Sequence, residues 1–278
     1  MSGNLDDIIA EHYRQEGLAA AILAGLEANG ADLDALTPED LAPVDEFHTA
    51  GRITTLRALD MTPLKEGMHV LDAGCGIGGT ARCLAREYGC RVTGIDLTPD
   101  YIEVARMLTE RMGLGERCRF DTGSATDLPY ENAAFDAGVT FHAAMNIEDR
   151  PRFYSELARV MKPGAPLCVY DVMKGPAPGM VFPVPWAETE ATSFLKTAAE
   201  TRALLEEAGF TVEKENNLRE FAIEWFRDTF TENEKRGSMP PLGLHLLVGA
   251  NAPEKFANYL KAAEAHQIEP VIQVARRG

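Results

Sequence analysis

The sequence has few basic residues and no long uninterrupted hydrophobic run. It contains 27 Lys and Arg against 43 Asp and Glu, for a formal net charge of −16. Because affinity for phosphate backbones and anionic lipid comes mainly from Lys and Arg, this balance disfavours nucleic acid or a membrane surface as a partner. No segment reaches the ~18 apolar residues of a membrane span, and no basic and apolar leader is recognisable. We expect a soluble, cytoplasmic protein that acts on a small molecule.

Paired cysteines and the common catalytic signatures are also missing. The five cysteines are an odd number and include no C-x-x-C pair, which fits a reducing compartment better than a disulfide framework. No His and Glu spacing predicts a zinc site, and no Ser, His and Asp arrangement resembles a hydrolase elbow. The sequence therefore favours neither a metal centre nor a nucleophilic side chain.

The hydrophobic pattern predicts an α/β fold. With 45% hydrophobic residues, the 278-residue chain can form one large domain with an added cap. Short runs rich in Val, Ile, Leu and Phe alternate with amphipathic helices, which is typical of a parallel sheet covered on both faces. We predict strands at 68–73, 91–96, 117–121, 135–141, 165–171, 210–218 and 271–274.

Three zones make up the predicted organisation. Residues 1–60 form a helical extension, because apolar residues recur at helical spacing over 5–29 and Thr37 marks a further helix start. Residues 61–172 form the core of the sheet. Residues 173–278 begin with a proline-rich segment and carry helices between the last two strands, so we expect a cap there.

An acidic residue and a glycine turn follow the first predicted strand. The run VLDAGCGIGG places Asp72 at the strand end and Gly74 and Gly76 in the turn. Glycine permits backbone conformations closed to other residues, so a ligand can approach bare backbone there. Asp96 ends the next strand twenty residues after Gly76, the spacing at which a carboxylate reaches ribose hydroxyls.

The chemistry of the turn distinguishes two cofactors. The glycines at 74, 76 and 79 match the dinucleotide pattern G-x-G-x-x-G. A carboxylate at Asp72 would repel a pyrophosphate, but it suits the ammonium and sulfonium groups of S-adenosylmethionine. The residues therefore favour a methyl donor over a nicotinamide cofactor. A noncatalytic module that only binds the cofactor is a further alternative.

Four linked segments over residues 68–171 resemble the class I S-adenosylmethionine-dependent methyltransferases. They read VLDAGCGIGG, VTGIDLT, GSATDLPYENAAFD and ELARVMKPGAPLCVYD. The preceding segment EFHTAGRITTLRAL is similar to that of small-molecule members, such as sarcosine/dimethylglycine N-methyltransferases and sugar O-methyltransferases. The resemblance implies a Rossmann-like seven-stranded sheet with an antiparallel last strand, helices on both faces, a helical N-terminal extension and a cap inserted before the last strand.

The same resemblance implies the residues that bind S-adenosyl-L-methionine and its product S-adenosyl-L-homocysteine. Asp96 would bind both ribose hydroxyls, Leu97 would pack on the adenine, and Arg52 would pair with the carboxylate of the donor. The full set of expected cofactor contacts is Asp72, Gly74, Gly76, Asp96, Leu97, Ser124, Ala125, Phe141, Thr49 and Arg52. The sequence departs from many relatives at Asn146, where they have a histidine.

His142 is the predicted catalytic residue. It follows Phe141 at the carboxyl end of a strand, where ligands bind in open α/β sheets. With an unperturbed pKa of ~6.5, it could take a proton from the acceptor, so turnover would rise through its titration range; it could also only orient the acceptor. The expected substrate contacts are Tyr13, His48, Phe182 and Trp186. Tyr13 and His48 could equally be packed structural residues.

The nature of the acceptor stays open at this stage. Methyl transfer needs mainly alignment in a closed pocket, which apolar residues such as Trp225, Phe226 and Met239 could provide. Aromatic ring faces and the negative charge mildly favour an amine, hence N-methylation of an amino acid or a similar molecule. O- or C-methylation of a natural product or sugar is the alternative. The sequence does not fix the oligomeric state.

Overall fold

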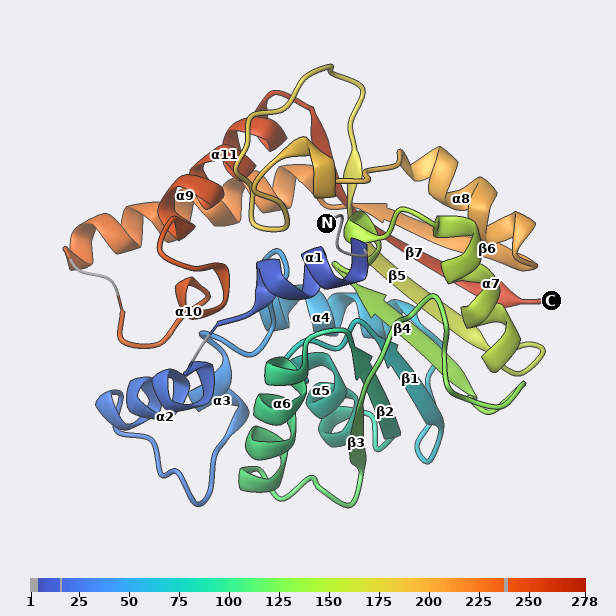
Figure 1. Ribbon diagram of the computed structural model, residues 1–278, viewed down its shortest axis with the longest axis horizontal. Coiled ribbons are helices and arrows are strands. Elements are labelled where there is room, and N and C mark those ends of the chain that lie inside the picture. Colours follow the sequence, from blue (N-terminus) through green and yellow to red (C-terminus); the bar gives the residue numbers. More distant parts are fainter. Residues whose placement is uncertain (1–4, 16, 238–239) are drawn as a thin grey trace.

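One seven-stranded mixed sheet dominates the computed structural model, which describes residues 5–15, 17–237 and 240–278 (Figure 1). The strands are β1 (His69–Ala73), β2 (Arg91–Asp96), β3 (Cys118–Thr122), β4 (Ala137–Phe141), β5 (Pro166–Lys174), β6 (Phe210–Asn217) and β7 (Ile268–Arg277). Their order is β3-β2-β1-β4-β5-β7-β6, with β7 antiparallel to both of its neighbours. The predicted Rossmann-like sheet with an antiparallel last strand is thereby confirmed.

Several strands differ in length from the prediction, and β7 and β4 show the reason. β7 runs from residue 268 to 277 because it pairs along its length with β5 and β6, so the apolar core at 271–274 marks only its middle. β4 begins at Ala137, and Phe135 forms only an isolated bridge with Met161. The difference arises because strand ends depend on neighbouring strands.

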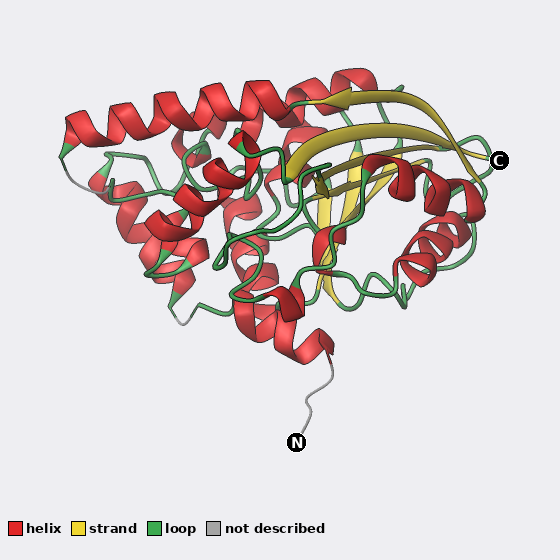
Figure 2. Cartoon of the chain, turned by 90° about the horizontal axis from the view of Figure 1, so that it is seen from above, coloured by secondary structure: helices red, strands yellow, loops and turns green. Residues whose placement is uncertain are grey.

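Helices cover both faces of the sheet, as Figure 2 shows from above. On one face, α4 (Gly51–Met61), α5 (Gly79–Glu87) and α6 (Pro99–Arg111) share a hydrophobic cluster with strand residues such as Val70 and Val92. On the other face, α7 (Arg150–Val160) and α8 (Ala198–Glu207) pack on Leu71 and Leu167. Successive strand residues point to opposite faces, so buried parallel strands are apolar throughout.

The N-terminal extension contains more helices than its pattern suggests. It consists of α1 (Leu5–Tyr13), α2 (Leu18–Ala28), α3 (Pro38–Leu41) and α4 up to residue 60. The single helical pattern expected over 5–29 is interrupted because Gly17 adopts a left-handed conformation with φ 76°. The helix start at Thr37 is confirmed, since its side chain and that of Asp40 form a reciprocal capping box.

The cap lies between β6 and β7, as expected. It consists of α9 (Arg219–Arg236), α10 (His245–Val248) and α11 (Ala252–Glu264). α10 packs against α2, where Leu242 and Leu247 join the apolar residues of the extension in one cluster. The extension and the cap therefore meet beside the sheet. None of the helices described is long and apolar enough to cross a membrane.

Candidate functional site

A cavity of about 1030 Å³ lies at the carboxyl ends of β1 to β4. One part, here called the sheet side, is formed by residues 74–77, 79–80, 95–98 and 123–126 at the ends of the first three strands. The other part, the cap side, is formed by Trp186 with residues of α9 and α11. Residues of α1 and α10 also line the cavity. The position is the usual one for a ligand in an open α/β sheet.

The glycine turn exposes backbone on the sheet side. The N–H groups of Gly74 and Cys75 donate to the carbonyl of Ile95 at 2.8 and 3.0 Å, which ties the turn to β2. Gly74 has φ 81°, and a Cβ there would lie 2.4 Å from the Cβ of Ala143. Gly76 has φ 52°, and a Cβ there would meet no atom within 4 Å. Gly76 therefore presents bare backbone to the cavity.

Asp96 is held in one orientation by two backbone donors. Its Oδ2 accepts from the N–H of Gly76 and its Oδ1 from the N–H of Thr98, both at 2.9 Å. Burial raises the pKa of Asp96, and these hydrogen bonds oppose the shift. The carboxylate thus joins the end of β2 to the glycine turn and borders the cavity.

Asp72 carries a buried oxygen that has no hydrogen-bond partner. The residue is 1% exposed and does not itself line the cavity, so it lies beneath the turn. Burial, followed by the charges of Asp96 and Glu46, raises the pKa of Asp72 to about 8. With this pKa the Asp72 carboxyl is largely protonated at neutral pH; a cationic ligand at the turn would favour its ionised form, whereas a pyrophosphate would disfavour that form further. The residues fit S-adenosylmethionine.

The other expected cofactor contacts lie along the cavity, but several polar groups among them are already engaged. Leu97, Ser124, Ala125, Phe141, Thr49 and Arg52 all line it. The Ser124 hydroxyl is 2.9 Å from that of Thr126. Arg52 donates to Glu87 at 2.7 Å, and the Thr49 hydroxyl is 2.7 Å from that of Tyr259. Arg52 therefore has a carboxylate partner within the protein.

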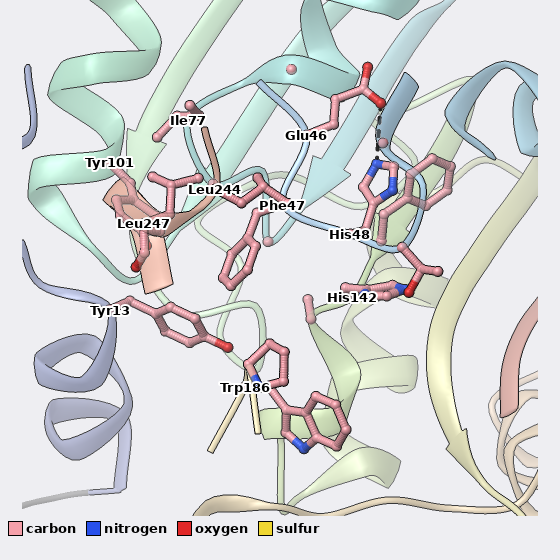
Figure 3. Close-up of a pocket in the computed structure, with 18 of the residues that line it drawn as sticks. Tyr13, Glu46, Phe47, His48, Ile77, Tyr101, His142, Trp186, Leu244 and Leu247 are labelled. Carbon is pink, nitrogen blue, oxygen red and sulfur yellow. Dashed lines mark hydrogen bonds and ion pairs between the residues drawn. The ribbon is translucent and has the colours of Figure 1, made fainter. Parts of the chain in front are cut away.

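Two histidines meet at the end of β4 (Figure 3). The ring centroids of His48 and His142 are 5.7 Å apart, and the ring of Tyr170 is 4.7 Å from that of His142. His48 Nε2 lies 2.9 Å from the hydroxyl of Thr55 and 3.4 Å from a carboxylate oxygen of Glu46. The second ring nitrogen of His48 is buried without a partner. Glu46 and Thr55 therefore fix His48 from one side.

The environment of His142 changes the prediction made for it. Burial, and then the nearby His48, lowers the pKa of His142 well below 6.5. Its Nε2 is buried without a partner, and its backbone is left-handed with φ 50°. The imidazole is therefore neutral throughout the neutral pH range. The rise of turnover expected near pH 6.5 moves to more acid pH, because desolvation disfavours the protonated ring.

Asn146 connects three segments around the cavity. The hydroxyl of Tyr13 donates to Asn146 Oδ1 at 2.7 Å. The side-chain amide of Asn146 donates to the carbonyls of Trp186 at 2.8 Å and Thr192 at 3.1 Å. Burial raises the pKa of Tyr13, so the phenol keeps its proton and can donate. Sequence reasoning assigned Asn146 no role, because its partners lie far away in the chain.

Only some of the residues expected to contact the acceptor line the cavity. Tyr13, His48 and Trp186 line the cavity, and the indole N–H of Trp186 donates to Ser193 at 2.9 Å. Phe182 does not line it, because its side chain packs into the hydrophobic cluster of the cap. Trp225 and Phe226 line it, and Met239 lies outside the described residues.

Sequence reasoning also missed part of the apolar lining. Figure 3 places Phe47, Ile77, Tyr101, Leu244 and Leu247 around the cavity beside Tyr13. Phe47 could have been found as the neighbour of His48, but no signal marks Leu244 or Leu247. In the described part of the chain, no cluster of three or more His, Cys, Asp or Glu residues is placed to hold a metal ion.

Comparisons with known proteins agree that the chain has a methyltransferase domain. Residues 71–169 match a family model described as a methyltransferase domain. An O-methyltransferase of Pyrenophora dematioidea is 31% identical over 209 residues, which cover 74% of this chain and 76% of that protein. Norajmaline N-methyltransferase of Rauvolfia serpentina is 37% identical over 107 residues, but these cover only 38% of this chain and 37% of the relative.

A solved structure shares the fold of the whole chain. Phosphoethanolamine N-methyltransferase 2 of Haemonchus contortus, in complex with S-adenosyl-L-methionine, superposes with a TM-score of 0.73 at 20% identity. The match covers 99% of this chain and 60% of that chain. It extends beyond the sheet to the helical extension and the cap.

Proposed function

Since the chain belongs to the class I S-adenosylmethionine-dependent methyltransferases, we propose that it transfers a methyl group to a small-molecule amine. The observation that carries the proposal is the pair of carboxyl groups at the glycine turn, with Asp72 buried beneath it and Asp96 bordering the cavity. Asp72 has an oxygen without a partner, and Asp96 is oriented by two backbone N–H groups. A donor with an ammonium and a sulfonium group would lower these raised pKa values and stabilise the ionised carboxylates.

When bound, S-adenosylmethionine would supply a methyl group on a sulfonium. The acceptor would lose its proton to solvent before the cavity closes and react as the free amine: its lone pair forms the new bond to carbon, the old bonding pair stays on sulfur, and the product leaves as an ammonium ion. Gly74, Gly76 and Asp96 would hold the donor. His142, as a neutral imidazole, would accept a hydrogen bond from the acceptor and orient its lone pair. Closure by Tyr13 and the cap would exclude water.

An oxygen acceptor is the second candidate. The relative that matches three quarters of the chain is named an O-methyltransferase. The amine is favoured because seven carboxylates line the cavity and would attract a cationic substrate. They are Asp6, Asp45, Glu46, Asp96, Glu148, Asp149 and Glu234.

The test measures donor binding and group transfer separately. Isothermal titration with S-adenosylmethionine and S-adenosylhomocysteine comes first, and a panel of amines, phenols and sugars is then screened for S-adenosylhomocysteine release. We expect binding of both nucleosides and the fastest release with an amine. Binding without release for any acceptor would leave a noncatalytic module. Faster release with a phenol or sugar would replace the amine by an oxygen acceptor.

A further inference from the structure

Aromatic side chains enclose the cap side of the cavity. The centroid of the Phe226 ring is 4.7 Å from that of Tyr259, 5.9 Å from that of Phe230 and 6.1 Å from that of Phe256. Trp186 completes this wall, 6.2 Å from Tyr259. These residues come from α9, α11 and the loop after β5, and all of them line the cavity. The wall can cover a large apolar surface.

The aromatic wall is continuous with the histidine pair. The hydroxyl of Tyr259 is 2.7 Å from that of Thr49, whose carbonyl accepts from the hydroxyl of Tyr170 at 3.1 Å. The ring of Tyr170 lies against His142. A ligand on the cap side would therefore extend from the aromatic wall to the end of β4.

No free cationic side chain faces this space among the described lining residues. Arg52 is the one Lys or Arg in that lining, and it is paired with Glu87. Lys255 lies nearby in α11, but it is buried outside the lining and paired with Glu188 at 2.6 Å. Burial also lowers the pKa of His142 and of His245, which disfavours their charged forms, and the third lining histidine, His48, already faces Glu46 at 3.4 Å. An anionic group would lose its hydration here without gaining a counter-charge, which is costly.

We propose that the acceptor is a bulky, largely apolar ring amine that carries no carboxylate or phosphate. The inference rests on the proposed function and narrows its substrate class, replacing the amino acid considered from the sequence. The cavity of about 1030 Å³ lies at the upper end of the roughly 300–1,000 Å³ common for ligand sites, so it can hold a donor and a multi-ring acceptor together. The rings of the acceptor would lie on the aromatic wall, with its nitrogen near His142.

A matched pair of ligands tests the charge preference. The probes are 1,2,3,4-tetrahydro-β-carboline and its 3-carboxylic acid, which differ by one carboxylate. With S-adenosylhomocysteine present, we expect titration to give at least ~10-fold weaker binding for the acid, because its anion stays unpaired. Equal binding, tighter binding of the acid, or no binding of the parent amine would overturn the inference.

A charge introduced on the cavity wall provides the reciprocal test. Thr229 lines the cavity on α9, so Thr229→Arg should improve binding of the acid ~10-fold relative to the parent amine. Thr231→Arg is the matched control, since Thr231 is exposed on the same helix and does not line the cavity. Both variants should bind S-adenosylhomocysteine like the wild type. An unchanged preference in Thr229→Arg would contradict the proposed position of the acceptor.

Turnover with different amines shows whether a failure concerns this inference or the proposed function. With S-adenosylmethionine, the parent amine should release S-adenosylhomocysteine faster than sarcosine or phosphoethanolamine, two small amines that carry an anionic group. Faster release with either small amine would overturn the bulky apolar acceptor but leave N-methylation intact. Release with none of the amines would overturn the proposed function itself.

Discussion

The sheet side of the cavity is built from the ends of successive, adjacent strands, whereas the cap side is built from segments far apart in the chain. Gly74, Gly76 and Asp96 lie at the ends of two adjacent parallel strands. Thr49 and Tyr259, which link the histidine pair to the aromatic wall, are 210 residues apart. The first region depends on backbone groups and two acids, and the second on the packing of side chains.

Removing Asp96 should have the largest effect of the substitutions considered. It should weaken binding of the donor on the sheet side and leave the cap side unchanged. Asp96→Ala deletes the acceptor of the Gly76 and Thr98 N–H groups and the expected ribose contact. Titration with S-adenosylhomocysteine should show a loss of roughly 1.5–3 kcal/mol, about 10- to 160-fold in Kd. Glu116→Ala, at an exposed position away from the cavity, is the control. Wild-type affinity in Asp96→Ala would refute the assignment of the donor site.

A methyl group added at the glycine turn tests how much the left-handed backbone and the close packing of the turn restrict its side chains. Gly74→Ala should cost about 2 kcal/mol or more of folding stability, because a left-handed conformation disfavours Ala and the new Cβ would meet Ala143. Gly76→Ala should cost about 1 kcal/mol, since its Cβ meets open space. Thermal melts compare the two variants. Equal loss of stability would show that the contact with Ala143 relaxes easily.

His142 lies where the two sides meet, so its loss should affect turnover and not donor binding. We expect His142→Ala to lower kcat about 10-fold, with the Kd of S-adenosylmethionine within about a factor of three. Because the lowered pKa keeps His142 unprotonated, the ratio of wild-type to variant turnover should stay constant from about pH 6 to 8.

The His142→Asn variant distinguishes orientation from proton transfer. Asn tolerates the left-handed backbone and keeps hydrogen-bonding groups, but it does not titrate. It should therefore retain more turnover than His142→Ala. A loss of ~10²-fold in both variants, together with a ratio that rises with pH through 6.5, would instead make His142 a general base.

Removing the hydrogen bond that attaches the N-terminal extension to Asn146 should have the smallest effect on ligand binding, and it should act on the cap side. Tyr13→Phe removes the 2.7 Å hydrogen bond to Asn146, worth about 1 kcal/mol, so ligand binding should weaken a few-fold. Hydrogen exchange in α1 and in 175–186 should slow on addition of S-adenosylhomocysteine, and less so in the variant. Tyr88→Phe, which removes a phenol bonded to Asp60 outside the cavity, is the control. Exchange unaffected by the ligand in the wild type would argue against closure.

The contrast between the two sides also explains which elements sequence reasoning recovered. β2 spans Arg91–Asp96 as predicted, because a buried parallel strand is a continuous apolar run with a clear end. The break at Gly17 was missed, since apolar residues continue at helical spacing on both sides of it. Phe182 was placed in the pocket because aromatic composition alone cannot distinguish cap core from cavity wall.

The sequence by itself determined the fold and the family, and it predicted the acids and glycines that we propose bind the donor. These depend on local patterns: strand periodicity, a glycine turn and the spacing of two carboxylates. Only the tertiary structure decided that His142 is neutral, that Arg52 is paired with Glu87, and that Asn146 joins Tyr13 to the cap. Burial, ion pairing and hydrogen bonding between distant segments arise from packing, because the chain must first fold to bring these groups together.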